Sequence, residues 1–264
     1  MSCAAPTISI IVVTKNPGPR LVATLESIWG QRWVQPEIII IDGGSTDGTL
    51  DWLGGQPAQI AVLVSENDRG VYDAMNKGVA LAQGDWVLFL GADDRLVGDM
   101  TLSEMRDYLT RTEAGVVAGE VAFDDGRIYR LSMRRSPLVR NFVHHQGAFY
   151  RRTLFTEMGK FDTSLAIMGD YDFNLRLWKS GVTFKAVDLR VAACGTHGLS
   201  DSGHWHGYRE EILVRHRYAA VARCWFWDLL SLVRFVRKKV LRTLPHAPPK
   251  WQQATHAPRR SPKP

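Results

Sequence analysis

The chain has 264 residues, of which 45% are hydrophobic and 23% are charged, and its formal net charge at pH 7 is +6. This composition is ordinary for a soluble globular protein, and it excludes both a disordered chain and a polytopic membrane protein. An α/β chain of this length often forms a single domain around one core. We therefore expect one α/β domain followed by a tail.

Cysteine usage and the N-terminal residues bear on the cellular compartment. Cys3, Cys194 and Cys224 are widely spaced and odd in number, which fits neither a disulfide framework nor a zinc site. The N-terminus lacks a basic region, and the apolar run Ile8–Val13 is too short for a signal peptide or a membrane span. We therefore predict a cytoplasmic protein without a cleaved export signal.

Strand and helix patterns alternate through the first ninety residues. The β-branched run Ile8–Val13 predicts a strand buried on both faces, helical spacing follows from Leu21 to Gly30, and Glu37–Ile41 predicts a second buried strand. The alternation continues with a helix over 47–53, a strand over 60–64, a helix over 72–82 and a strand over 86–90. This pattern predicts a mostly parallel sheet flanked by helices, with polar loops at the carboxyl ends of its strands.

The pattern after Asp94 is less regular. We expect a helix over 102–111, short strands over 116–123 and 128–131, and a helix over 170–179 that Gly181 ends. Residues 208–244 are helical in pattern, and the Pro-rich, basic residues 245–264 predict disorder. The chain thus divides into an α/β domain over 1–202, a basic amphipathic helical extension over 203–244 and a disordered tail over 245–264.

A glycine-rich turn, DGGSTDGT, follows the second predicted strand at residues 42–49. Glycines allow a backbone to approach a ligand closely, and Asp42 can accept hydrogen bonds from a base or a ribose. Ser45 or Thr46 can cap the next helix. The same residues also fit a capped surface loop with no ligand.

Asp93 and Asp94 follow the strand predicted over 86–90. Carboxylates at this place can hold a hard divalent cation, Mg or Mn, that neutralises a diphosphate leaving group. The alternative is an acidic turn on the surface.

Asp170 and Asp172 open the helix predicted over 170–179. A carboxylate there can take the proton from an attacking hydroxyl, and Asp170 is the candidate general base. The alternative is structural, with Asp170 capping the helix and Asp172 stabilising its dipole.

Together these motifs resemble the family 2 inverting glycosyltransferases of the GT-A fold. The resemblance rests on residues 8–16 (ISIIVVTKN), on the turn at 42–49, on Asp93–Asp94 and on residues 65–78 (SENDRGVYDAMNKG), which look like the segment that the family places beside the donor. It covers residues 7–200. It implies a Rossmann-like, mostly parallel central sheet and transfer of a sugar from a nucleotide-diphosphate sugar to an acceptor hydroxyl, in cell-surface polysaccharide or glycolipid biosynthesis.

The resemblance also implies roles for single residues. Asp94 would be the main metal ligand, although Ala92 stands where the family's Asp-X-Asp motif has its first carboxylate. Asp170 would be the base, although Gly169 replaces the Glu of the family's Glu-Asp pair. His197 would be a late metal ligand, with His204 and His206 as alternatives. The residues expected to bind the donor are Thr14, Asn16, Asp42, Ser45, Arg69, Gly70, Asp73, Asn76, Lys77 and Asp93.

Residues 145–152 (HQGAFYRR) resemble a strand of related polysaccharide and glycolipid enzymes. This likeness implies that His145 and Gln146 lie near the sugar or the acceptor. Asp172 is the further residue that we expect to contact the acceptor. Either His144 or His145 also fits a buried, hydrogen-bonded histidine.

The positive charge lies mainly in the tail, since residues 203–264 hold 13 Lys/Arg against 3 Asp/Glu, and the rest of the chain holds 20 against 24. Aromatic residues 225–227 beside cations suit an interfacial helix on an anionic membrane surface at the inner face of the plasma membrane, near a lipid-linked acceptor. The alternative is a helix that packs its aromatic side on the domain. No base-reading motif indicates a specific nucleic-acid partner.

Two other functions fit the same motifs. A sugar-phosphate nucleotidyltransferase also uses an α/β sheet with acidic metal ligands, but it gives Asp170 no role. A catalytically inactive nucleotide-sugar-binding protein fits the altered acidic motifs.

Overall fold

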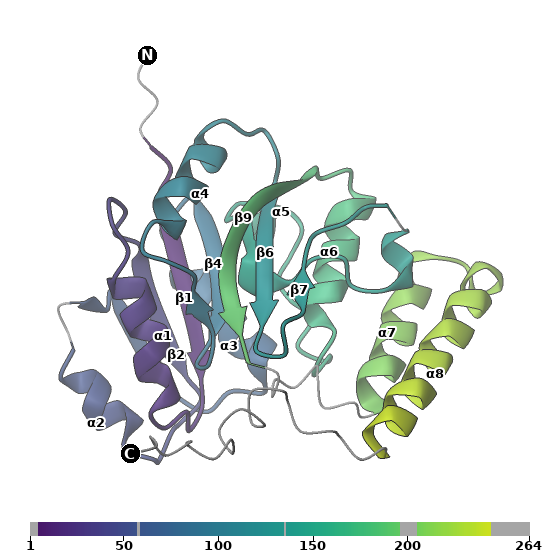
Figure 1. The fold of residues 1–264 in the computed structure, drawn as a ribbon, viewed down its shortest axis with the longest axis horizontal. Helices are drawn as coiled ribbons and strands as arrows, with labels where there is room; N and C mark the ends of the chain where they lie inside the picture. The colour runs from purple at the N-terminus through teal and green to yellow at the C-terminus, as the bar shows by residue number, and fades with distance from the viewer. Residues whose placement is uncertain (1–4, 57–58, 135, 196–204, 244–264) are drawn as a thin grey trace, which may run out of the picture.

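The computed structural model describes residues 5–56, 59–134, 136–195 and 205–243 (Figure 1). Its first elements are β1 (Ile8–Thr14), α1 (Arg20–Trp29), β2 (Glu37–Asp42), α2 (Thr49–Gly54), β3 (Val62–Ser65), α3 (Val71–Leu81), β4 (Trp86–Gly91), β5 (Arg95–Leu96) and α4 (Thr101–Thr110). They are followed by β6 (Val116–Phe123), β7 (Ile128–Tyr129), the 3-10 helices η2 (Pro137–Val139) and η3 (His145–Gly147), β8 (Ala148–Arg151), α5 (Leu154–Glu157), α6 (Gly169–Lys179), β9 (Phe184–Cys194), α7 (Trp205–Tyr218) and α8 (Val221–Thr243).

The strands form one mixed sheet. Its order in the described ranges is β3-β2-β1-β4-β8-β6-β9-β5, with β7 paired to β6. β1 pairs in parallel with β2 and β4, and β2 pairs in parallel with β3. β8 is antiparallel to both β4 and β6, so it joins the parallel half to the rest of the sheet. The carboxyl ends of β1, β2, β3 and β4 therefore lie along one edge.

Apolar layers cover both faces of this sheet, because successive side chains of a strand point to opposite faces. On one face, Ile11 and Phe89 belong to a cluster with residues of α3, α5 and α6. On the other face, Ile10 and Leu88 belong to a cluster with residues of α1 and α4. Every residue of β1 is buried, and a continuous β-branched run suits a strand that is covered on both sides.

The alternation predicted for the first half is confirmed. The third strand begins at Val62 and ends at Ser65, slightly later than expected, and the strand expected over 128–131 is limited to Ile128–Tyr129. β9 was not predicted, because Lys185, Asp188 and Arg190 interrupt its apolar pattern; parallel pairing with β6 forms it.

The helical region expected over 208–244 consists of two helices at one end of the molecule, with α7 beside α6 and α8 beside α7 (Figure 1). Val214 of α7 belongs to the same apolar cluster as α6, so this extension packs on the α/β domain. The tail over 245–264 lies outside the described residues. Across the described ranges, every helix is too short or too polar to cross a bilayer.

Gly78 in α3 lets this helix approach β1 closely. A Cβ atom here would lie 2.4 Å from Ile11 Cγ2, whereas a Cβ atom at Gly54 would meet nothing within 4 Å. We predict that Gly78→Ala is less stable than Gly54→Ala by about 1–3 kcal/mol, the usual cost of overpacking a core. Urea unfolding of both variants measures the difference, and equal stabilities would contradict this packing of α3 on β1.

Candidate active site

A cleft of about 470 Å³ opens where β1 and β4 end. Thr14 and Lys15 line it from the end of β1, and Asp93 and Asp94 line it from the end of β4. The lining also includes Tyr72 from α3, His145 and Gln146 from η3, and Ala166 and Ile167 from the loop before α6. The fold therefore brings together residues from widely separated parts of the chain, from Val13 to Ile167.

The glycine-rich turn is folded around the carboxylate of Asp42, which has no exposed surface. Its Oδ2 accepts hydrogen bonds from the Ser45 N–H at 2.8 Å, the Gly44 N–H at 3.1 Å and the Ser65 hydroxyl at 2.7 Å, and its Oδ1 accepts one from the Ser45 hydroxyl. These hydrogen bonds determine the conformation of the turn. A contact between Asp42 and a base or ribose stays a prediction.

Asn16 joins this turn to the loop after β1. Its N–H donates to Ser45 Oγ at 2.7 Å, and its Oδ1 accepts from the Thr46 N–H at 2.8 Å. The φ of Asn16 is +47°, a left-handed conformation that asparagine tolerates better than most residues. Asn16 and Ser45 thus hold the loop after β1, whose Lys15 and Pro17 line the cleft.

Thr14 differs from these residues because its hydroxyl has no hydrogen-bond partner within the described part of the chain, although it is buried. An unpaired buried hydroxyl costs free energy. Since Thr14 lines the cleft, a ligand there can supply the missing partner.

The donor residues expected on α3 fall into two groups. Asn76 is buried, and its side chain makes two hydrogen bonds to the backbone of Phe161 at 2.9 and 3.0 Å, so it ties α3 to the loop before α6. Arg69, Asp73 and Lys77 form a chain of ion pairs at the N-terminal part of α3, with Arg69–Asp73 at 3.0 Å and Lys77–Asp73 at 3.7 Å. Gly70 precedes α3 with a φ of +121°.

The two aspartates after β4 differ in environment. Asp94 is buried and its Oδ2 accepts the Gly91 N–H at 2.7 Å, whereas the side chain of Asp93 is about one-third exposed and lies 4.0 Å from Arg20. Burial raises the pKa of Asp94, although hydrogen bonds from the Cys194 thiol and the Gly91 N–H act in the opposite direction.

The carboxylates of Asp93 and Asp94 are oxygen ligands of the kind that a hard divalent cation prefers. A divalent cation beside Asp94 would offset the cost of burying its negative charge. Mg²⁺ sites often contain one or two carboxylates, with substrate phosphates and water as the other ligands. Within the described ranges no group of three or more His, Cys, Asp or Glu residues is arranged as a metal site, so Asp93, Asp94 and the substrate would have to hold the ion. His197 and His204 lie outside the described residues, and His206 pairs with Glu210 on α7.

Asp170 lies in the first turn of α6, next to the cleft, and is held by four groups. Its Oδ1 accepts the Tyr72 hydroxyl at 3.1 Å and the Tyr171 N–H at 2.8 Å. Its Oδ2 accepts the Asn141 amide at 2.8 Å and lies 3.1 Å from His145 Nδ1. A carboxylate only accepts, so this contact places the ring proton of His145 on Nδ1.

Burial acts to raise the pKa of Asp170, but the contact with His145, the charge of His144 and the Tyr171 N–H together hold this pKa below its ordinary value. The charge of His145 also acts on Asp94. Asp94 therefore lines the cleft, and Asp170 lies directly behind its lining, in contact with the lining residues Tyr72 and His145. His144 is the buried histidine of the pair, and burial lowers its pKa to about 4.

Gly169 stands where the resemblance expects a Glu, and the structure gives a steric reason for the change. A Cβ atom at Gly169 would lie 2.7–2.9 Å from the ring of Tyr72. The same tyrosine donates to Asp170 and to the Ile167 carbonyl. Glycine thus allows the aromatic ring to support the candidate base.

Asp172 is not brought into the cleft. Its carboxylate accepts from Arg176 at 3.0 Å and from Arg217 at 2.9 Å, and it also accepts the Tyr218 hydroxyl. These contacts join α6 to α7. A role of Asp172 toward the acceptor stays a prediction.

The C-terminal helices also support the cleft, which the sequence did not indicate. The carboxylate of Glu210 in α7 accepts the N–H groups of Ala166, Ile167 and Met168 at 2.8–2.9 Å. Two of these three residues line the cleft. Sequence reasoning missed three functional candidates, namely Tyr72, Asn141 and Glu210. Their partners are at least 29 residues away in the chain, so no local pattern indicates these contacts.

Residues 9–172, more than half of the chain, match the family described as Glycosyl transferase family 2. The chain belongs to this family. It is therefore a glycosyltransferase, and the GT-A fold with a mostly parallel sheet and flanking helices is confirmed. Family membership removes the support for the nucleotidyltransferase alternative.

Known relatives extend this result. A PGL/p-HBAD biosynthesis glycosyltransferase of Mycobacterium bovis is 38% identical over 192 residues, which cover 67% of this chain and 72% of the relative. S. aureus TarS 1-349 in complex with UDP-GlcNAc has a TM-score of 0.64 and 19% identity, over 79% of this chain and 65% of that one. The mannosyltransferase PcManGT from Pyrobaculum calidifontis, in complex with GDP-Man and Mn2+, has a TM-score of 0.61 and 20% identity, over 95% and 79%. At these identities the two structures show the fold alone.

Thr14→Val tests the unpaired hydroxyl. If it binds the donor, its loss raises KM for the nucleotide sugar about tenfold, the value of one hydrogen bond. The fold should be as stable as before or more stable, because no protein group loses a partner. Thr24→Val is the matched control, since the Thr24 hydroxyl is also buried and unpaired but lies in α1, outside the cleft. Equal KM values for the two variants would contradict the assignment.

Proposed function

We propose that this glycosyltransferase moves one sugar from a nucleotide-diphosphate donor to an acceptor hydroxyl, with inversion at the anomeric carbon. The observation that carries the proposal is that buried Asp94 lines the cleft while buried Asp170 contacts His145 and Tyr72, two residues of the same lining. A single displacement needs one site that stabilises the leaving diphosphate and one base for the incoming hydroxyl.

The donor side of the cleft suits a diphosphate. Lys15 and Arg20 line it together with Val71, the first residue of α3. Cations and the free N–H groups of a helix N-terminus both attract phosphate oxygens. The complexes of relatives with UDP-GlcNAc and GDP-Man support a nucleoside diphosphate sugar as the donor. The further donor residues of the proposal are Asn16, Asp42, Ser45, Arg69, Gly70, Asp73, Asn76 and Lys77.

Asp93 and Asp94 are the residues that would hold Mg²⁺ or Mn²⁺, and the Mn2+ complex of PcManGT supports this part of the proposal. The bound cation would supply charge neutralisation at the departing diphosphate. His197 stays a predicted further ligand. The side chain of Asp93, which lies beside Arg20, would orient the charged end of the donor.

Asp170 is the proposed base. A carboxylate whose pKa is lowered is a weak base for a free alcohol, but the hydroxyl becomes strongly acidic as its oxygen bonds to the sugar. A proton transfer that is concerted with the displacement therefore suits this residue. Tyr72, Asn141 and His145 would hold the carboxylate in place, and one of their hydrogen bonds would give way to the acceptor hydroxyl.

The acceptor is proposed to be lipid-linked, in the biosynthesis of a cell-surface glycolipid or polysaccharide. The name of the Mycobacterium bovis relative and the basic, aromatic helix α8 support this choice. The loop at Ala166 and Ile167, which α7 holds, would form part of the acceptor side with His145 and Gln146. Such an enzyme would work at the cytoplasmic face of the membrane.

Asp170→Asn separates chemistry from binding. The variant keeps the shape of the side chain but cannot accept the proton, so hydrolysis of the nucleotide sugar should slow by about 10²–10⁴-fold, the usual contribution of a general base. Donor binding should be unchanged. Asp172→Asn is the control from the same helical turn; it should lose stability but keep the rate per folded molecule. A wild-type rate for Asp170→Asn would refute the proposed base.

Removal of the cation tests Asp94. With Mn²⁺ present at saturating nucleoside diphosphate, thermal unfolding of the wild type should be delayed, because a ligand at about 100 times its Kd stabilises by about 2.7 kcal/mol. EDTA treatment and Asp94→Asn should each remove this stabilisation, whereas Asp99→Asn, a change in a surface ion pair, should retain it. Equal stabilisation of Asp94→Asn and the wild type would exclude Asp94 as the ligand.

A further inference from the structure

Helix α8 carries an exposed apolar face. Its side chains are between 44% and 63% exposed, and they belong to Trp225, Phe226, Leu229, Leu232, Val233 and Val236. At about 100° per residue, these positions fall within an arc of about 120° on one side of the helix. The face is therefore a continuous stripe, and we call it the outer face of α8.

Cations border the outer face on both sides. Arg237 and Lys239 are exposed, and each lies about 20° beyond one edge of the stripe. Asp228 is the acidic residue of this helix; it lies outside the stripe and pairs with Arg215 and His216 of α7. The outer face thus combines apolar surface with positive charge and holds no negative charge.

The opposite side of α8 makes the contacts with the protein. Phe235 packs edge-on against Trp205 and Tyr208 of α7, with ring centroids 5.1 and 5.6 Å apart. Ser231, which is fully buried, donates to Glu211 at 2.6 Å. The outer face is consequently the side of α8 that points away from α7.

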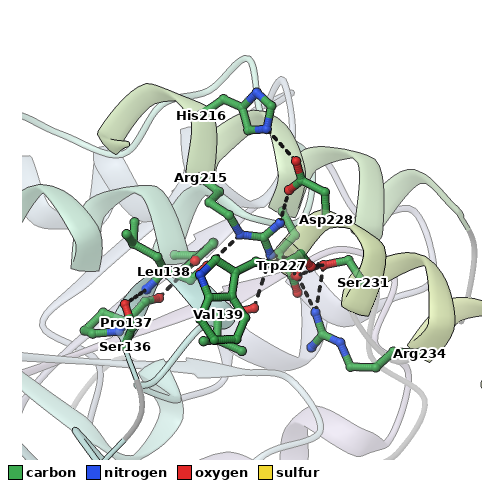
Figure 2. Close-up of polar contacts among 12 residues, drawn as sticks. Ser136, Pro137, Leu138, Val139, Arg215, His216, Trp227, Asp228, Ser231 and Arg234 are labelled. Carbon is green, nitrogen blue, oxygen red and sulfur yellow. Dashed lines mark hydrogen bonds and ion pairs between the residues drawn. The ribbon is translucent and has the colours of Figure 1, made fainter. Parts of the chain in front are cut away.

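Arg215 fixes α8 to the acceptor side of the domain. Its buried guanidinium lies between α8 and η2 (Figure 2), donating to the Leu138 carbonyl at 2.6 Å and the Val139 carbonyl at 3.1 Å and pairing with Asp228. Asn141, two residues beyond η2, donates to Asp170. The orientation of the outer face is therefore coupled to the candidate active site through a short series of contacts.

We propose that the outer face of α8 is a docking surface for an anionic lipid bilayer. Aromatic and aliphatic side chains would enter the boundary between headgroups and acyl chains, while Arg237 and Lys239 would contact anionic headgroups. Two copies of the chain suit this face less well, because pairing two outer faces would bring their border cations together. Bilayer binding goes beyond the proposed sugar transfer, and neither donor nor acceptor is needed to measure it.

Vesicle co-sedimentation of the full chain tests this surface. The wild type should pellet with vesicles of equal parts phosphatidylcholine and phosphatidylglycerol, and much less with phosphatidylcholine alone. Leu229→Glu combined with Val233→Glu should lower binding at least tenfold. Arg237→Glu combined with Lys239→Glu should remove the preference for the anionic vesicles. Leu81→Glu combined with Tyr108→Glu, which alters exposed apolar side chains on α3 and α4, should bind as the wild type does.

Two results would overturn the proposal. The first is an absence of the expected lipid binding. It would appear as wild-type protein that stays in the supernatant with both kinds of vesicle, or as outer-face variants that pellet as the wild type does. The other is a wild-type dimer in solution that Leu229→Glu with Val233→Glu converts to a monomer, because a second copy would then cover the face. Stabilisation by nucleoside diphosphate with Mn²⁺, measured for each variant, reports the fold and the donor site separately from lipid binding.

Discussion

Burial of β1 and β4 between two apolar layers is the constraint on which this structure depends. Neither strand has a solvent-facing side, so the polar side chains that face a ligand can lie only where the strands end. Because β1, β2, β3 and β4 are parallel, those ends meet at one edge. Thr14 and Asp94 therefore reach the same cleft from different parts of the chain.

The pKa values of the two buried carboxylates, Asp94 and Asp170, are shifted in opposite directions. Asp94 keeps few internal donors, and burial raises its pKa, so its charge is best stabilised by a cation from outside the protein. Asp170 is surrounded by four donors, and its pKa is lowered. The first environment suits the proposed metal ligand, and the second suits the proposed base.

Local patterns were sufficient to predict the first half of the fold and the location of the acidic pair. The β-branched runs and the glycine-rich turn depend on residues that are close in the chain, so the sequence alone is enough to recognise them. β9 and the contacts of Asp170 were not readable in this way. β9 carries charged residues along its length and is formed by its pairing with β6. Asn141 contacts Asp170 from the loop after η2, and Arg215 of α7 contacts η2.

The C-terminal helices illustrate the same limit. The sequence offered a membrane helix and a packed helix as alternatives, and the packing of α8 on α7 now explains how one helix has both a packed side and an exposed apolar side. Asp172, which the sequence analysis expects to contact the acceptor, lies two positions after Asp170 in the chain. On a helix, however, a residue two positions away points elsewhere, here toward Arg217 of α7.

The central claim is that a sugar donor lies between Asp94 and Asp170. The most direct measurement is a crystal structure with Mn²⁺ and a nucleoside diphosphate sugar, in which anomalous scattering locates the manganese ion. The account predicts manganese coordinated by Asp94 and the diphosphate, with the anomeric carbon turned toward Asp170. Manganese or nucleotide bound away from this cleft, or a sugar that points away from Asp170, would contradict it.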